Sequence, residues 1–287
     1  MKKLVIPESY NYIAAFLTFQ CNLTCSYCIN ANNTIDRRRK LLSGQEWVKG
    51  LERIVTRPGL PITFGGGEPT MHSDFYYLVN ALHEKGYEMD LLTNSIFHVD
   101  AFMQQVKPEV FKREALYASI RVSYHPETMK ANVLLDKVSK MLQAGYHIGI
   151  WAVGHPKYSK EIFDFGNEAN KRGIDFRLKE FLGTYEGRVY GSYKYDDACV
   201  GVAMVRQVQC KTSELIIGPN GNIYRCHTDL YIDDDSHFQI GNILDEQFEI
   251  EDKYRRCDVY GFCNPCDIKV KYDRFQQMGH CAVDIIK

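Results

Sequence analysis

The chain has 287 residues, a formal net charge of −1, 45% hydrophobic residues and 25% charged residues. This length fits a large domain joined to a smaller one, and this composition is typical of a globular protein with a hydrophobic core. The balanced charge argues against a nucleic-acid-binding protein, which usually carries a basic excess. No stretch reaches the ~18 consecutive apolar residues that cross a membrane, and polar residues interrupt the N-terminal segment where a signal peptide needs an apolar core. We therefore expect a cytoplasmic protein.

Strands and helices are predicted to alternate through the first two-thirds of the chain. Short apolar runs indicate strands at 12–18, 61–64, 88–93, 118–123, 147–153 and 175–179. A capping box from Ser43 to Glu46 begins a helix that continues to about Val55. Further helices are expected at 72–85, 126–142 and 157–172, each followed by a glycine that can end it. This order predicts a parallel sheet with outer helices. Six units are too few for a closed eight-stranded barrel, so we expect an α/β fold with a partial (βα)6 TIM-like barrel.

The sequence changes character after Gly187. The segment "GRVYGSYKYDD" is rich in Gly, Tyr and Asp and is typical of a linker or of a loop that crosses the mouth of the barrel. Further on, "SELIIGPNGNIYRC" predicts a β-hairpin with strands at 215–217 and 223–224, because Asn-Gly is a strong hairpin-turn signal. We therefore divide the chain into a core domain at 1–187 and a smaller domain at 188–287.

Ten cysteines are unevenly distributed along the chain, with three at 21–28 and seven from Cys199 onward. The spacing Cys21-x3-Cys25-x2-Cys28 follows the first predicted strand, at the end of a parallel sheet where sites are built. Clustered thiolates suit zinc or an iron–sulfur cluster. Structural zinc prefers four ligands, whereas three ligands on a four-iron cluster leave one iron free. Zinc with a distant fourth ligand and unligated thiols remain alternatives.

The motif Cys-x3-Cys-x-Tyr-Cys resembles the signature of radical S-adenosylmethionine (SAM) enzymes. In "ITFGGGEPT", a Gly-Gly-Glu sequence after the second strand resembles the motif with which this family binds the methionine amine of SAM. Glycine lets a backbone approach a ligand closely, and a carboxylate complements an ammonium group. The resemblance covers about residues 11–180. It implies that Cys21, Cys25 and Cys28 are the catalytic residues that hold a 4Fe-4S cluster.

The resemblance also implies a set of SAM contacts. They are expected at Tyr27, Gly66, Gly67, Glu68, Asn94 and Ser123. Tyr27 would lie beside the adenine, and Ser123 stands where relatives bond the SAM ribose. Asn94, in "LLTNS", resembles the family's "TNG" strand end. Asn94 and Ser123 are equally typical of turns and helix caps.

Cysteines near the C-terminus resemble a second cluster site. Cys210-x10-Gly221-x4-Cys226 resembles the opening of the SPASM and twitch domains, which hold auxiliary four-iron clusters. The later run Cys257-x5-Cys263-x2-Cys266 departs from the full SPASM pattern, so one auxiliary cluster is expected. Its expected ligands are Cys210, Cys226, Cys263 and Cys266. A zinc ribbon built from the same two pairs is the alternative. Cys257 and Cys281 are reserve ligands. If unligated, Cys199, Cys257 or Cys281 is a hydrogen-atom donor or an inert buried thiol.

The resemblance implies reductive cleavage of SAM to methionine and a 5′-deoxyadenosyl radical, which abstracts a hydrogen atom from the substrate. An electron donor such as flavodoxin or ferredoxin would be needed. We expect oxidation, crosslinking or epimerisation of a peptide or small metabolite. Alternatives are a dehydrogenase or rearrangement enzyme for an amino sugar or nucleoside, and a non-catalytic iron–sulfur or zinc protein. About ten residues precede the first strand, so no N-terminal peptide-recognition module is expected. His125, Arg177, Lys179 and Glu180 are possible substrate contacts or solvent-facing residues.

Overall fold

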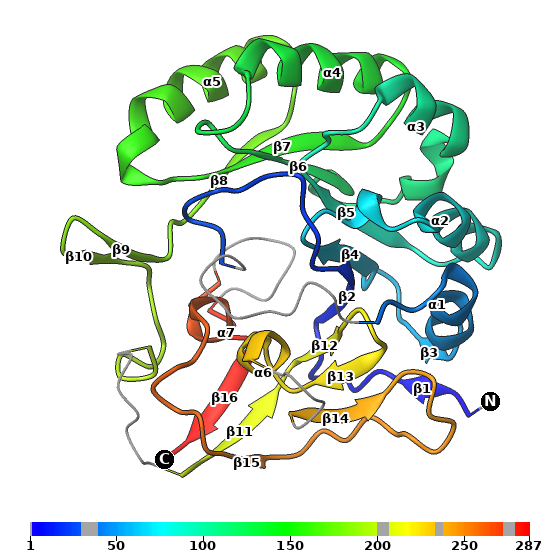
Figure 1. Ribbon diagram of the computed structural model, residues 1–287, viewed down its shortest axis with the longest axis vertical. Helices are drawn as coiled ribbons and strands as arrows, with labels where there is room; N and C mark the ends of the chain where they lie inside the picture. Colours follow the sequence, from blue (N-terminus) through cyan, green and yellow to red (C-terminus); the bar gives the residue numbers. More distant parts are fainter. Residues whose placement is uncertain (1, 30–39, 200–206, 233–237, 272–278) are drawn as a thin grey trace.

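A nine-stranded sheet organises the fold, and helices α1 to α5 form an arc outside it (Figure 1). The computed structural model describes residues 2–29, 40–199, 207–232, 238–271 and 279–287. The strand order is β14-β13-β12-β2-β4-β5-β6-β7-β8. Strands β2 to β8 of this sheet pair in parallel. They are β2 (Tyr12–Thr18), β4 (Ile62–Gly66), β5 (Met89–Thr93), β6 (Ile120–Tyr124), β7 (Ile148–Val153) and β8 (Phe176–Lys179). The six predicted parallel strands and the partial barrel are confirmed.

The outer helices differ from the predicted ones mainly at their ends. They are α1 (Gly44–Leu51), α2 (Phe75–Glu84), α3 (Val99–Gln105), α4 (Ala131–Gln143) and α5 (Ser159–Lys171). Short 3-10 helices precede three of the later elements, at η1 (Pro69–Met71), η2 (Pro108–Phe111) and η3 (Pro156–Tyr158).

The prediction of a helix through Val55 is wrong, because α1 ends at Leu51 and β3 (Ile54–Val55) pairs in parallel with β1 (Leu4–Val5). Long-range pairing of these two residues outweighs the local continuation of the helix. The sequence also gave no signal for α3. Its N-cap is His98, which is not among the preferred capping residues.

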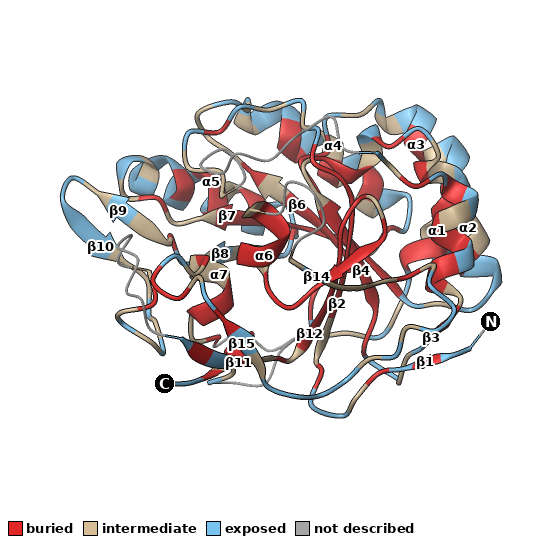
Figure 2. Ribbon diagram, turned by 60° about the horizontal axis from the view of Figure 1, so that its bottom comes forward, coloured by how far each residue is buried: buried red, intermediate tan, exposed pale blue. Residues whose placement is uncertain are grey.

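The alternation of side chains along β2 separates the core from the site. Ile13, Ala15 and Leu17 pack into the large core between the sheet and the outer helices. Ala14 and Phe16 point to the opposite face, where they join a smaller apolar cluster. Successive strand residues face opposite sides of a sheet, so one strand supports the core and lines the inner face. Figure 2 shows the same division, with buried strands inside and exposed outer faces on the helices.

The C-terminal part of the chain extends the barrel sheet. The predicted hairpin is confirmed as β12 (Glu214–Ile217) and β13 (Asn222–Tyr224), with Gly221 at a positive φ of 82° in the turn. Strand β12 pairs in parallel with β2, with Glu214 opposite Tyr12. This pairing brings residues about two hundred positions apart to the inner face of one sheet.

The remaining C-terminal elements lie beside that hairpin. Strands β15, β11 and β16 form a separate antiparallel sheet. The elements are β11 (Val208–Thr212), α6 (His227–Ile232), β14 (Gln239–Asn242), β15 (Arg255–Cys257), α7 (Pro265–Ile268) and β16 (Val283–Ile286). Figure 1 places this sheet, with α6 and α7, below the barrel strands.

A small hairpin lies where the sequence predicts a linker. Strands β9 (Gly183–Tyr185) and β10 (Arg188–Tyr190) pair antiparallel, and Glu186 and Gly187 form the turn with positive φ angles. The predicted division after Gly187 therefore falls between two paired strands, and the division into two domains stays a prediction.

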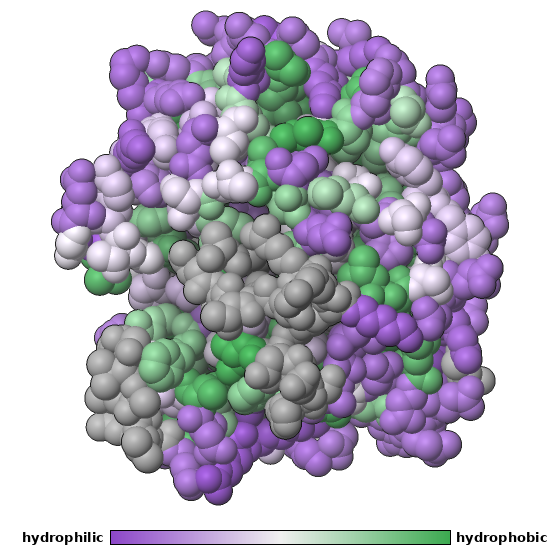
Figure 3. All heavy atoms as spheres, viewed as in Figure 1, coloured by the Kyte–Doolittle hydropathy of each residue, from purple (hydrophilic) through white to green (hydrophobic). Residues whose placement is uncertain are grey.

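The molecular surface carries mainly hydrophilic residues over the outer helices (Figure 3). Within the part of the chain that the structure describes, no helix is long and apolar enough to cross a membrane.

Candidate active site

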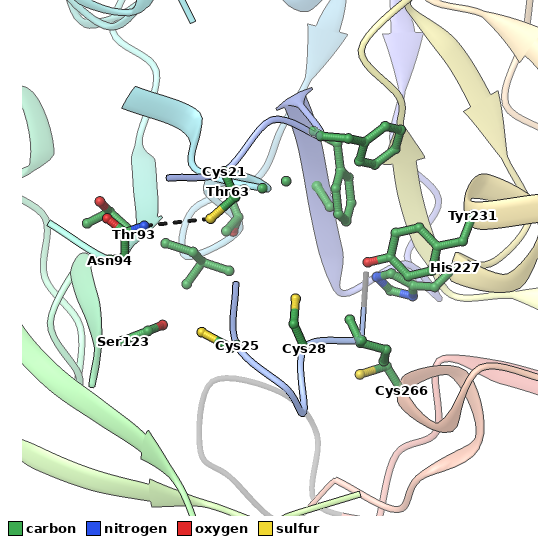
Figure 4. A pocket seen from close by; sticks show the side chains of 18 of the residues that line it. Cys21, Cys25, Cys28, Thr63, Thr93, Asn94, Ser123, His227, Tyr231 and Cys266 are labelled. Atoms are coloured by element: carbon green, nitrogen blue, oxygen red, sulfur yellow. Dashed lines mark hydrogen bonds between the residues drawn. The ribbon is translucent and has the colours of Figure 1, made fainter. Parts of the chain in front are cut away.

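A cavity of about 350 Å³ lies between the cysteine loop that follows β2, the C-terminal ends of the barrel strands, and the C-terminal region. Cys21, Cys25 and Cys28 all line it. Figure 4 shows the loop thiols between Asn94 and Ser123 on one side and His227, Tyr231 and Cys266 on the other. The three predicted cluster ligands thus share one cavity with four of the six predicted SAM contacts, namely Gly66, Gly67, Asn94 and Ser123.

The cysteine loop is held in a compact turn. The backbone N–H of Cys28 donates to the Cys25 carbonyl at 3.1 Å, and the N–H of Leu23 donates to Cys21 Sγ at 3.4 Å. The Ser26 hydroxyl donates to Glu127 Oε2 at 2.8 Å, which ties the loop to the segment after β6. Burial raises the pKa of the Cys25 thiol to about 11. The loop therefore presents its thiols from a fixed backbone.

The glycines of the Gly-Gly-Glu segment allow close contact between two strand ends. A Cβ at Gly66 would overlap the Thr18 carbonyl oxygen, and one at Gly67 would overlap the Gln20 carbonyl oxygen. The N–H of Gly67 donates to Thr18 O, and the N–H of Glu68 donates to Gln20 O, both at 2.8 Å. Both glycines line the cavity. They join β4 to the start of the cysteine loop at the wall of the cavity.

Glu68 lies beneath the cavity. Its side chain is 0% exposed, and Glu68 is not among the residues that line the cavity. Burial raises the pKa of its carboxyl group, although four hydrogen bonds oppose that effect. The N-H of Asn94 donates to Oε2 at 2.6 Å, and the Thr93 hydroxyl donates to Oε1 at 2.7 Å. The predicted SAM ligand therefore holds the end of β5.

The other predicted SAM contacts occupy different positions. Ser123, near the end of β6, lines the cavity, as does Asn94. Tyr27 lies behind the loop, where its hydroxyl and His125 Nδ1 are 3.1 Å apart and its ring lies 5.1 Å from the ring of His155. His125 lines the cavity, and burial lowers its pKa to about 4. Arg177, Lys179 and Glu180 do not line the cavity.

The wall opposite the loop comes from the C-terminal region and is charged. The buried ammonium of Lys271 pairs with the buried carboxylate of Glu214. His227 Nδ1 lies 2.7 Å from Asp267 Oδ1. Burial opposes protonation of His227, but the Asp267 carboxylate outweighs this effect and raises the pKa of His227. Sequence reasoning missed this wall because the pairing of β12 with β2 creates it.

Six C-terminal thiols gather in a second, buried cluster. Its cysteines are Cys199, Cys210, Cys226, Cys257, Cys263 and Cys281. The Cys210 thiol donates a hydrogen bond to Cys257, which lowers the pKa of Cys257. The thiols of Cys199 and Cys281 donate to the carbonyl oxygens of Cys263 and Asp267, both at 3.1 Å.

Cys266 is the predicted auxiliary ligand that is not a member of this apolar cluster. It is still near Cys199, because burial, and after it the charges of Asp267 and Cys266, raise the pKa of the Cys199 thiol. Cys266 lines the main cavity, close to Lys269 and Lys271. Its neighbour Asp267 accepts from the backbone N–H of His227 at 2.9 Å, which keeps this segment beside Cys226. The structure thus brings together three of the four predicted auxiliary ligands and sets the fourth on the cavity side.

The donor set fits a group larger than one ion at the first site. Three thiols from one loop border a cavity of about 350 Å³, and soft thiolates are the ligands of iron–sulfur clusters. Within the described residues, no three His, Cys, Asp or Glu side chains form a ligand group for a single metal ion.

An open parallel α/β barrel with a three-cysteine loop at its carboxyl end defines the class of this protein. Residues 16–113 match the family model described as "Radical SAM superfamily". This segment, about a third of the chain, is therefore similar to the radical SAM superfamily, and the predicted resemblance is confirmed.

Two curated relatives match parts of the chain. The S-adenosylmethionine-dependent nucleotide dehydratase of Selenomonas ruminantium is 32% identical over 118 residues, which are 40% of this chain and 40% of that protein. The PqqA peptide cyclase of Bradyrhizobium diazoefficiens is 35% identical over 80 residues, which are 28% of this chain and 21% of that protein. The matched segments thus span two-fifths or less of these relatives.

Solved structures share the fold over most of the chain. Streptococcus suis SuiB superposes with a TM-score of 0.55 at 15% identity, covering 83% of this chain and 64% of SuiB. Native anSMEcpe with bound AdoMet and Cp18Cys peptide gives a TM-score of 0.53 at 14% identity, covering 86% of this chain and 79% of anSMEcpe. At these identities the likeness concerns the fold.

Proposed function

We propose that the protein is a radical SAM enzyme that uses a 4Fe-4S cluster on Cys21, Cys25 and Cys28 to modify a peptide or a small metabolite. The observation that carries this proposal is the single cavity shared by these three thiols and the Gly66–Gly67 backbone. When bound, the cluster supplies the electron that cleaves SAM to methionine and a 5′-deoxyadenosyl radical. The chain's own residues position the reactants and exclude competing chemistry.

The two walls of the cavity have different roles in this proposal. The loop thiols, Gly66, Gly67 and Ser123 form the cofactor side. His227, Lys271 and Cys266 form the facing side, where a substrate would bind. The apolar rings of Phe16 and Tyr231 also line the cavity, and they restrict access of water to a reactive intermediate.

Two substrate classes are supported by named relatives. One relative is named a peptide cyclase and the other a nucleotide dehydratase. The anSMEcpe structure contains a peptide. We propose a peptide as the first candidate substrate. A nucleotide-like small molecule is the second, because that relative matches the longer stretch of this chain.

A second, auxiliary four-iron cluster belongs to the proposal. Its proposed ligands are Cys210, Cys226, Cys263 and Cys266, with Cys257 as the alternative because it is hydrogen-bonded to Cys210. The buried surroundings of Cys210 and Cys226 suit electron transfer, and Cys266 also lines the cavity. A flavodoxin or ferredoxin would supply the external electron.

Formation of 5′-deoxyadenosine tests the proposed function. The protein is reconstituted with iron and sulfide without oxygen, then supplied with SAM and a strong reductant. We expect 5′-deoxyadenosine from the wild type and none above background from Cys28→Ala. Equal yields from the two proteins, with or without candidate peptides and nucleotides, would contradict an enzymatic role for the loop.

A further inference from the structure

The Glu68 carboxylate is held by four hydrogen bonds. The hydroxyl of Thr70 donates to Oε1 at 2.6 Å and its N–H donates to the same oxygen at 3.2 Å. Thr93 donates a third bond to Oε1, and Asn94 donates a bond to Oε2. The side chain is also 0% exposed and does not line the cavity. Its oxygens therefore face the segments that they hold and not the space in which a bound group would lie.

The bonds of Glu68 hold the segment that carries Asn94. The Asn94 side-chain amide leaves the β5 end toward the cysteine loop, as Figure 4 shows. Its Nδ2 donates to Cys21 Sγ at 3.7 Å and to Asn22 Oδ1 at 2.6 Å. Its Oδ1 accepts from the N–H of Ile96 at 2.9 Å. The amide is therefore oriented by three contacts, and one of them reaches a proposed cluster ligand.

Cys21 differs from Cys25 in the hydrogen bonds that its sulfur accepts. It receives N–H groups from both Leu23 and Asn94. The neighbouring thiol of Cys25 has the Thr128 hydroxyl at 4.0 Å. N–H donors stabilise the negative charge on a thiolate, and hydrogen bonds to the sulfurs help to set the potential of an iron–sulfur cluster.

We propose that Glu68 is a positioning residue that acts through Asn94, and that the Asn94 amide binds and tunes the Cys21 ligand of the cluster. Glu68 fixes the β5 end, and Asn94 donates to sulfur. This inference rests on the proposed function, because it assigns roles around the same cluster. It differs from the expectation that the Glu68 carboxylate binds the SAM amine.

The test uses variants of Asn94 and Glu68 that separate the positioning role of Glu68 from direct binding of the SAM amine. Asn94→Ala removes the donor, and Asn94→Asp removes it while keeping the size of the side chain. Glu68→Gln keeps the shape but replaces one acceptor oxygen with a donor. Asn80→Ala is the matched control, because it also removes a hydrogen-bonding amide, which donates to the carbonyl oxygens of Tyr76 and Gln105 and does not line the cavity. The cluster signal to follow is the electron paramagnetic resonance signal that Cys21→Ala/Cys25→Ala/Cys28→Ala abolishes.

Three measurements then have defined outcomes. We expect a more negative midpoint potential in the Asn94 variants and in Glu68→Gln, because the reduced cluster loses an N–H donor or its orientation. Loss of iron to a chelator should be faster by roughly 10–100-fold, as for other outer-shell partners. The double variant Glu68→Gln/Asn94→Ala should behave like Asn94→Ala, since residues acting through one contact are not additive. Asn80→Ala should match the wild type.

The dissociation constant of SAM tests whether the Glu68 carboxylate binds the SAM amine directly. Loss of a hydrogen bond to a charged group weakens binding by about tenfold or more. We expect Glu68→Gln to weaken SAM binding by less than that. A larger loss with an unchanged potential would overturn the inference, as would unchanged potentials in both Asn94 variants. A wild-type protein without any SAM-responsive cluster would instead contradict the proposed function, and this inference with it.

Discussion

The two cysteine regions of the molecule are built in opposite ways. Cys21, Cys25 and Cys28 come from one loop, and all three open onto a cavity. Cys210, Cys226 and Cys257 come from or follow separate strands and lie buried in one apolar cluster. An open set of thiols leaves room for a further ligand, whereas an enclosed set suits a group that exchanges only electrons.

The hydrogen bonds of the thiols also differ between the two cysteine regions. Cys21 receives N–H donors from Leu23 and Asn94. Cys210 and Cys257 are hydrogen-bonded to each other. Fixed amide donors can support a charged thiolate in contact with a polar cavity, while paired thiols in an apolar site share one proton. The first region is therefore organised for chemistry at a position that a further ligand can occupy.

The largest expected effect concerns the iron that each of the two cysteine regions holds. The variant Cys21→Ala/Cys25→Ala/Cys28→Ala should lose SAM cleavage completely and still retain about four irons per chain. Iron and sulfide analysis of the reconstituted proteins provides the measurement. Near-zero iron in this variant would refute an independent C-terminal cluster.

The next prediction concerns that retained iron. In the same background, Cys226→Ala should remove it, because Cys226 is a proposed ligand and belongs to the buried thiol cluster. Cys281→Ala is the matched control and should keep it, since the Cys281 thiol donates to the Asp267 carbonyl. We also expect Cys266→Ala to lose iron and Cys257→Ala to retain it. The reverse result would exchange these two residues in the ligand set.

A third prediction tests how firmly the C-terminal wall is joined to the barrel sheet. Lys271 and Glu214 are 7% and 1% exposed. Lys271→Met removes the ammonium group that pairs with this buried carboxylate and should lower the free energy of unfolding by about 3–5 kcal/mol. Urea denaturation provides the measurement. The exposed pair of Lys253 and Glu251 offers a control, where Lys253→Met should cost less than about 1 kcal/mol. Equal costs would show that the buried pair contributes no more than a surface pair.

The smallest expected effect concerns the pH dependence of stability, to which His125 in the site region and Asp284 in the C-terminal region contribute in different pH ranges. Burial lowers the pKa of His125 to about 4 from an ordinary value of 6.5. The unfolded chain therefore takes up the proton first, and stability falls as pH drops from 6.5 toward 4, by up to about 3 kcal/mol. Hydrogen bonds from Tyr254 and Tyr195 lower the pKa of Asp284 to about 2 from 3.8. The contribution of Asp284 to the free energy of unfolding is fully present above pH 3.8 and is lost as the pH falls toward 2.

Urea denaturation across this range checks both windows. His125→Phe should flatten the dependence between pH 6.5 and 4, and Asp284→Asn should flatten it only below pH 3.8. An unchanged slope in His125→Phe between pH 6.5 and 4 would contradict the assignment to the site region.

Local patterns predicted the parts of the fold that depend on neighbouring residues. The apolar run at 12–18 and the capping box at Ser43 specify β2 and the start of α1. The Asn-Gly turn specifies the β12–β13 hairpin. The cysteine spacing predicted the loop because all its members lie within eight positions of one another.

The sequence by itself determined the resemblance to radical SAM enzymes, the partial barrel and the three thiols at the carboxyl end of its first strand, because each signal is local or periodic. Only the tertiary structure decided which side chains face those thiols. The pairing of β12 with β2 brings Glu214 and the C-terminal wall to the cavity, and no local pattern encodes such a distant contact. Tertiary packing likewise buried Glu68 under the site and directed Asn94 to Cys21, because hydrogen-bond partners depend on how strand ends meet in space.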